Sequence, residues 1–176
     1  MRRNRGFTLY ELHMTLGLAG LLLSIGIPSF TATLARNRQA IEVNALFHAV
    51  HLARKESIMR RKVVSLCPSR NNSTCSADRD WSSGWLLFEN TDRDSPPQVD
   101  PGEVVLRSHR VADNIRIRSN RRGFTLRATF LRATNGTIVV CDTGNSIRPK
   151  GLVISYTGRP RVALKRPDGT FYSCAD

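Results

Sequence analysis

Basic side chains that could bind phosphate groups are concentrated toward the end of the 176-residue sequence. From position 148 to position 176 there are six basic and two acidic residues. The basic residues are Arg148, Lys150, Arg159, Arg161, Lys165 and Arg166. An arginine fork binds phosphate through two hydrogen bonds and can stack on a base. Gly158 permits a close backbone approach, and Pro160 stiffens the turn from which Arg159 and Arg161 project. These six residues and Gly158 are therefore predicted to form a polyanion-binding surface, with an ordinary solvated basic face as the alternative.

Charge is segregated along the rest of the chain as well. Residues 78–103 contain seven acidic and two basic residues, whereas residues 107–132 contain eight arginines and one acidic residue. The formal net charge of +13 favours polyanionic partners and says nothing about the fold. A basic strip that neutralises phosphates releases counterions, and phosphate contacts carry no sequence information. Binding of a phosphate polyanion through such a strip is thus expected to depend on salt and to be independent of sequence.

Four cysteines, none in a C-x-x-C pair, lie beyond the apolar N-terminal segment. An even number at wide spacing indicates two disulfides in an oxidising compartment. Three pairings are possible. We favour Cys67–Cys75, which closes a short polar loop, and Cys141–Cys174, which would hold the C-terminus in place. The spacing does not fit a zinc site.

The other candidate sites carry weaker patterns. His48 and His51 are three residues apart, a spacing that packed or exposed histidines adopt more often than a metal pair does. The segment Asn90–Asp94 resembles the start of a calcium loop, but Ser95 and Pro101 stand where that loop requires glycine and glutamate. Paired carboxylates and a Cys/His dyad are absent from the sequence pattern. The sequence therefore predicts no enzyme, no metal, no cofactor and no small-molecule substrate.

The N-terminal segment has the composition of a membrane helix. Residues between Leu12 and Pro28 are almost all apolar, and residues 7–34 include one acid and no Lys or Arg. This length is sufficient to span a bilayer, which takes about 20 apolar residues. The arginines that precede it predict a cytoplasmic N-terminus. A carboxylate in such a run needs a partner, and no Lys or Arg within a turn downstream of Glu11 can supply one.

The residues from Gly6 to Leu12, Gly-Phe-Thr-Leu-Tyr-Glu-Leu, resemble the prepilin peptidase site of type IV pilins and type II secretion pseudopilins. The resemblance implies cleavage between Gly6 and Phe7 and N-methylation of Phe7. It also implies that Glu11 pairs with the new amine of a neighbouring subunit during assembly. Pro28 stands where pilins often carry a helix-loosening proline. A plain single-span anchor is the alternative, and His13 departs from the usual aliphatic residue.

One long helix is expected over residues 7–61, which is roughly 80 Å at 1.5 Å per residue. Its second half carries an apolar stripe that should pack on a head domain. The stripe consists of Ile41, Leu46, Leu52 and Ile58, with Ala45 and Ala49 beside Leu46. Turn signals then separate eight candidate strands. The candidate strands are 63–67, 85–89, 104–107, 115–118, 124–130, 137–141, 152–156 and 161–165.

This order of elements predicts an α+β protein with a type IV pilin-like fold, in which a long N-terminal α-helix packs on an antiparallel β-sheet head. Four regions follow. Residues 1–6 are the prepilin leader, 7–35 the membrane-inserting half of the helix, 36–62 its amphipathic half, and 63–176 a β-rich periplasmic head domain.

Two segments of the head extend the resemblance. Trp81-Ser-Ser-Gly-Trp85 resembles the W-x-x-G-W signature of the minor pilins and pseudopilins called FimT, FimU and GspH. Gly158-Arg-Pro-Arg161 resembles the G-R-x-R motif of the DNA-binding FimT members. The chain is most similar to this last group. The likeness implies a minor type IV pilin that binds extracellular DNA for uptake in natural transformation. The alternative is a structural minor pilin or a type II secretion pseudopilin, active in assembly, twitching or secretion without binding DNA.

The same resemblance implies the partners and the location. The expected partners are DNA, the other pilins of the filament and the prepilin peptidase. The protein is expected to cross the bacterial inner membrane once, with its head in the periplasm, and then to enter the extracellular pilus, where the tip is one candidate position.

Overall fold

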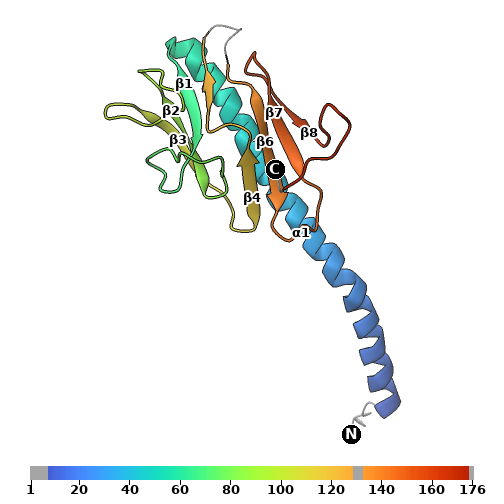
Figure 1. The fold of residues 1–176 in the computed structure, drawn as a ribbon. Helices are drawn as coiled ribbons and strands as arrows, with labels where there is room; N and C mark the ends of the chain where they lie inside the picture. Colours follow the sequence, from blue (N-terminus) through green and yellow to red (C-terminus); the bar gives the residue numbers. More distant parts are fainter. Residues whose placement is uncertain (1–7, 129–132, 175–176) are drawn as a thin grey trace.

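The computed structural model describes residues 8–128 and 133–174. One helix, α1 (Leu9–Arg60), extends well beyond a head made of two sheets (Figure 1). Its 52 residues correspond to about 78 Å. Thr8 caps the N-terminus, and Arg61 ends the helix in the left-handed conformation. The helix predicted from the sequence is confirmed over these residues, whereas Phe7 lies outside the described part.

The two halves of α1 have different surroundings. Almost every residue before Ala35 is exposed, including long apolar side chains such as Leu21, Leu22 and Ile25. By length and composition this part of α1 could cross a membrane. The helix continues through Pro28. From Ala35 onward one face is covered by the head, so the first half is left free for an apolar environment.

The buried face of α1 differs from the predicted stripe. Leu46 and Ala49 are buried as expected, but Ile41 is 61% exposed and Ile58 is 46% exposed. The face that packs on the head repeats at three- and four-residue intervals and includes small and polar residues. Its members are Ala35, Gln39, Glu42, Val43, Leu46, Ala49, Val50, Ala53 and Ser57. The prediction was wrong for Ile41 and Ile58 because it followed the large aliphatic residues, whereas close contact with the sheets selects small ones.

Among the described residues, eight strands follow the helix, one at each place where the sequence predicts a strand. They are β1 (Val64–Pro68), β2 (Gly84–Glu89), β3 (Val105–Arg110), β4 (Ile115–Ser119), β5 (Phe124–Leu126), β6 (Gly136–Asp142), β7 (Lys150–Ile154) and β8 (Pro160–Ala163). The predicted strand 124–130 is shortened to three residues, and positions 129–130 lie outside the described part. Every pairing is antiparallel. The strands form two four-stranded sheets, β3-β2-β1-β5 and β4-β6-β7-β8. The fold class is confirmed, with the refinement that the head contains two sheets.

The core lies where both sheets meet the second half of α1. Trp81 and Trp85 are fully buried in it. The Trp81 ring centre is 5.8 Å from that of Phe124, and Trp85 stacks on His109 at 5.0 Å. Gly84, between them, has φ +151, and a Cβ there would lie 2.5 Å from the carbonyl oxygen of His109. Trp81, Gly84 and Trp85 therefore pack the core and do not form a surface for ligands.

Two disulfides complete the head. Cys67 is joined to Cys75 and Cys141 to Cys174, which are the pairings that the sequence favours. The first closes the loop between β1 and β2. The second fastens the C-terminal segment to β6, on the side of the second sheet away from α1.

Candidate functional site

The β7–β8 hairpin presents the two arginines of the Gly158–Arg161 motif. The Ser155 amide donates to the Arg159 carbonyl at 3.1 Å, and the Gly158 amide donates to the Ser155 carbonyl at 2.9 Å. The Ser155 hydroxyl accepts the Arg159 amide at 3.2 Å. Pro160 is buried, whereas Arg159 and Arg161 are exposed. The turn is therefore closed by backbone bonds, and both guanidinium groups are accessible in the isolated chain.

Gly158 has a different role from the one that its sequence context suggests. It is buried with φ +69, and a Cβ there would lie 3.2 Å from Leu126 Cδ2 and 3.4 Å from Ala133 Cβ. The close approach that glycine permits is thus an approach to the protein's own side chains. Beside it, Arg54 Nη1 of α1 donates to the Thr157 carbonyl at 2.7 Å. Gly158 accordingly positions the motif's arginines and is not placed to contact a ligand.

A second basic group lies near the other end of the hairpin. The Arg148 guanidinium carbon is 4.7 Å from the Phe171 ring centre, and Lys165 Nζ is 5.0 Å from it. Cations beside a ring in this way are attracted by its quadrupole. Phe171 is 45% exposed. Phe171 was not predicted from the sequence. The signal that could have indicated it is the turn at residues 166–169. This turn folds the C-terminal segment back, so that Lys165 and Phe171 form an antiparallel backbone bridge.

The structure distributes the six predicted basic residues along the hairpin. Arg161 is paired with Val153, and Ala163 is paired with Gly151. Lys150 is paired with the buried Val140, so its side chain lies on the α1 side of the second sheet, on the opposite face from Arg161. Because β8 ends at Ala163 and the chain bends at Leu164, Arg161 and Lys165 are separated by at most roughly 13 Å at about 3.3 Å per residue. Arg166 stands apart from the others, with its guanidinium carbon 5.7 Å from the Tyr172 ring centre. The predicted surface is thus a strip with Arg159 and Arg161 at one end and Arg148 and Lys165 at the other.

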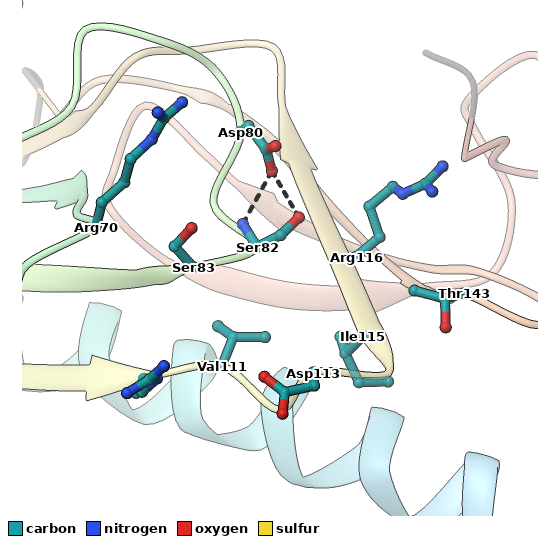
Figure 2. Close-up of a pocket in the computed structure, with 10 residues that line it drawn as sticks. Arg70, Asp80, Ser82, Ser83, Val111, Asp113, Ile115, Arg116 and Thr143 are labelled. Carbon is teal, nitrogen blue, oxygen red and sulfur yellow. Dashed lines mark hydrogen bonds between the residues drawn. The ribbon is translucent and has the colours of Figure 1, made fainter.

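A cavity of about 390 Å³ lies between the first sheet and β4 (Figure 2). It is lined by Arg70, Arg110 and Arg116 together with Asp80 and Asp113. Burial opposes ionisation of Asp80, but two hydrogen bonds from Ser82 and the charges of Arg118 and Arg70 outweigh it. Together they hold the pKa of the Asp80 carboxyl below its usual value. Because both signs of charge line this cavity, its arginines are partly neutralised by its own acids.

The acidic segment after β2 brings three carboxylates together. Oxygen atoms of Asp92, Asp94 and Asp100 lie within 4.8 Å of one another. Burial raises the pKa of Asp94, as does the charge of Asp92, although the Gln98 amide opposes the change. The calcium-loop likeness of Asn90–Asp94 therefore corresponds to a real cluster of carboxylates. Beside it the buried Asn90 donates to Asp94 at 2.8 Å, while its Oδ1 accepts no hydrogen bond from the described residues.

Several residues of the N-terminal helix and of the segment before it were candidates in the sequence analysis, and the structure describes only some of them. His48 and His51 are exposed beside Phe47, with the His51 and Phe47 ring centres 4.7 Å apart. Glu11 has a partner that the sequence analysis did not identify. Its carboxylate accepts the Thr8 amide at 2.9 Å and the Thr8 hydroxyl at 2.8 Å. The Thr-x-x-Glu spacing of a capping box was the signal. Gly6 and Phe7, the predicted cleavage and methylation positions, lie outside the described residues.

Comparison with known proteins gives a consistent picture. Residues 42–158, about two thirds of the chain, match the profile of the family described as "Type II transport protein GspH". A pilin-like protein, PilA1 of Thermus thermophilus, is 28% identical over 170 residues, which cover 90% of this chain and 97% of that protein.

Solved structures with the same fold include two minor filament subunits. The type IV minor pilin FimU of Pseudomonas aeruginosa is 21% identical, with a TM-score of 0.55 over 79% of this chain and 96% of that one. The minor pseudopilin EpsH of the Vibrio cholerae type 2 secretion system is 8% identical, with a TM-score of 0.51 over 72% and 96%. At these identities the likeness shows the fold alone.

Proposed function

This chain belongs to the GspH family, and we propose that it is a minor type IV pilin that binds extracellular DNA for uptake in natural transformation. The observation that carries the proposal is the β7–β8 hairpin with its exposed Arg159 and Arg161. Between positions 148 and 166 the sequence has six basic residues and no acidic one. A strip of this kind binds the phosphate backbone of any DNA sequence.

The geometry of the strip suits an extended polyanion. Its two ends are up to roughly 13 Å apart along the strand direction, so cations at both ends can contact different phosphates of one DNA strand. Phe171 adds an exposed aromatic surface between Arg148 and Lys165 at one end. Arginine and aromatic side chains together are the usual components of sequence-tolerant contacts with single-stranded DNA.

The membrane and assembly roles belong to the same proposal. The exposed apolar half of α1 would anchor the protein in the inner membrane with the head in the periplasm, before entry into the filament. Prepilin peptidase would cleave after Gly6, and the other pilins would pack on α1. Residues 1–6, 7–35, 36–62 and 63–176 would then be the leader, the membrane half, the amphipathic half and the head.

A structural minor pilin or type II secretion pseudopilin that binds no DNA is the second candidate. Family membership and the fold are equally consistent with it. The two candidates differ in what the hairpin arginines do, so a binding measurement separates them.

The test uses the full chain in a nonionic detergent and a labelled 30-base-pair duplex over a series of salt concentrations. Arg159→Ala/Arg161→Ala should weaken binding about tenfold or more and lower the salt slope by about 2, since each phosphate contact contributes close to one unit. The matched control is Arg107→Ala/Arg110→Ala, which removes the same charge from exposed positions of β3 in the other sheet. Equal losses in both double variants would reduce the effect to net charge, and weak, equal binding by all three proteins would favour the structural candidate.

A further inference from the structure

A second cavity, of about 450 Å³, lies on the side of the second sheet that faces away from α1. Its lining includes Arg79 from the β1–β2 connection, Arg118 from β4 and Arg166 from the C-terminal turn. Val139 and Tyr172 contribute apolar surface. Three arginines that are far apart in the sequence therefore converge on one hollow, separate from the motif at Arg159 and Arg161.

The backbone fixes where these arginines stand. Ile115 and Ile117 of β4 point into the core, so Arg116 and Arg118 point to the opposite face. Arg118 is opposite Val139 in the β4–β6 pair. The Arg79 carbonyl accepts the Ser119 amide at 3.1 Å, which holds the β1–β2 connection against the end of β4.

The other wall is the C-terminal segment. Tyr172 lies directly over Gly151 of β7, where a Cβ would be only 2.4 Å from its ring. The Cys141–Cys174 disulfide fastens the segment two residues further on. Arg166 is held by the turn in which its amide donates to the Thr170 carbonyl at 2.8 Å. The cavity thus lies between the second sheet and a C-terminal segment that is fastened to this sheet by a disulfide.

The cavity has one sign of charge. None of the lining residues that the structure describes here is acidic, in contrast to the cavity in Figure 2. Asp80 is the nearest acid along the chain to Arg79 and forms a backbone bridge with Arg118. Its carboxylate lines the other cavity, where it accepts the Ser82 amide at 3.0 Å and the Ser82 hydroxyl at 2.6 Å. Its charge still acts on Arg118, whereas Arg79 and Arg166 complete the positive lining. An anion with an attached apolar group is the ligand that such a lining suits.

We infer that this cavity binds one nucleotide unit of single-stranded DNA, with the phosphate held by Arg79, Arg118 and Arg166 and the nucleoside against Val139 and Tyr172. Arginine forks match phosphate oxygens, and the volume lies in the range of small-ligand sites, about 300–1,000 Å³. The inference rests on the proposed function and deepens it, because it adds a site for a strand end or a frayed strand to a strip that binds duplex.

The experiment measures, by calorimetry on the full chain in detergent, the dissociation constants of a ten-nucleotide oligothymidylate, thymidine 5′-monophosphate and inorganic phosphate. Arg118→Ala should weaken the oligonucleotide and the monophosphate about tenfold, and Arg118→Lys should weaken them less. The matched control is Arg116→Ala, two residues away on the same exposed face of β4 but outside this cavity. Its constants should stay within twofold of the unmodified protein.

Equal losses for Arg116→Ala and Arg118→Ala would overturn the inference, as would inorganic phosphate binding as tightly as the monophosphate. The outcome is separable from that of the proposed function. Duplex binding that depends on Arg159 and Arg161, without an effect of Arg118 on the single strand, would reject the cavity and keep the strip. Monophosphate binding that depends on Arg118, in a protein that fails to bind duplex, would keep the cavity and reject the strip as a duplex-binding surface.

Discussion

At the scale of single residues, Glu89 shows how the end of α1 is fixed to the first sheet. Its side chain is almost fully buried at the end of β2, and its two oxygens accept from Arg60 Nη1 at 2.7 Å and Lys62 Nζ at 2.5 Å. The hydrogen bond from Lys62, together with Arg60, outweighs burial and holds the pKa of Glu89 below its usual value. The helix end, the reversal at Arg61 and β2 thus meet at one carboxylate.

Stability should therefore depend on pH through Glu89. A carboxyl whose pKa is lowered by folding stabilises the protein above its unfolded pKa, about 4.3, and loses that contribution as pH falls through the folded pKa. Glu89→Gln should lower the free energy of unfolding by about 1–3 kcal/mol at pH 7, and the difference should shrink toward zero below pH 4. Denaturant titrations followed by tryptophan fluorescence measure it. The control is Glu56→Gln, which breaks a helix-surface pair with Arg60 worth about 0.3–0.5 kcal/mol. A difference that stayed constant from pH 7 to pH 3 would contradict this assignment.

Residue patterns predicted some parts of the site and not others. Alternation in Ile115–Arg118 correctly indicated a strand with arginines on one face. The exposure of Arg159 and Arg161 followed from turn residues around them. Phe171 was signalled only by the turn at residues 166–169, whereas the Arg118 cavity could not be predicted, because it depends on how the C-terminal segment folds back across β7. No local period encodes that contact, which joins residues far apart in the chain.

At the scale of elements, the sequence also predicted some features and not others. The eight strands and the helix were predictable from turn residues and periodicity, whereas the face of α1 that packs on the head was not. Ala53 and Ser57 are fully buried and Ile41 is exposed, because a helix lying close against two sheets favours small side chains at the contact. A prediction that follows only the large aliphatic residues therefore places this interface on the wrong face of the helix.

The C-terminal segment gives a prediction at this scale. The Cys141–Cys174 disulfide closes 33 residues and Cys67–Cys75 closes 8. In the chain-entropy account a larger closed loop stabilises more, about 3–4 kcal/mol against about 2–3 kcal/mol. Two variants keep one disulfide each, Cys67→Ala/Cys75→Ala and Cys141→Ala/Cys174→Ala. For each variant, the difference in the free energy of unfolding between oxidising and reducing buffer measures the contribution of the remaining disulfide. Reduction should destabilise the first variant more than the second, and the opposite order would show that the short loop matters more.

At the scale of the whole molecule, α1 joins two different environments. Its exposed apolar half extends away from the head (Figure 1), and the basic strip lies on the second sheet beside its buried half. Glu11 lies in the first turn of the apolar half, and its carboxylate is bound to Thr8 of the same chain. Pairing with a neighbour's amine would exchange this internal contact for one between subunits.

Glu11→Ala should leave membrane insertion unchanged and lower the amount of protein in sheared filaments about tenfold or more. Insertion follows from the apolar run, whereas assembly is proposed to need the carboxylate. Immunoblots of membrane and filament fractions measure both. The matched control is Thr8→Ala, which removes the capping hydroxyl but keeps the carboxylate. Incorporation of Glu11→Ala at the normal level would refute the assembly role, and an equal defect in Thr8→Ala would assign the effect to helix capping.

The hydrogen bond from Arg54 to the Thr157 carbonyl has a mechanical consequence. β8 is an edge strand held by β7 alone within its sheet, and such a strand yields one bond at a time when pulled from its end. The turn that precedes it is tied directly to α1 and is packed against Leu126 beneath Gly158. Under the proposed function, tension on DNA bound at Arg159 would therefore be shared between β8 and α1, because Arg54 ties the adjacent turn to the helix.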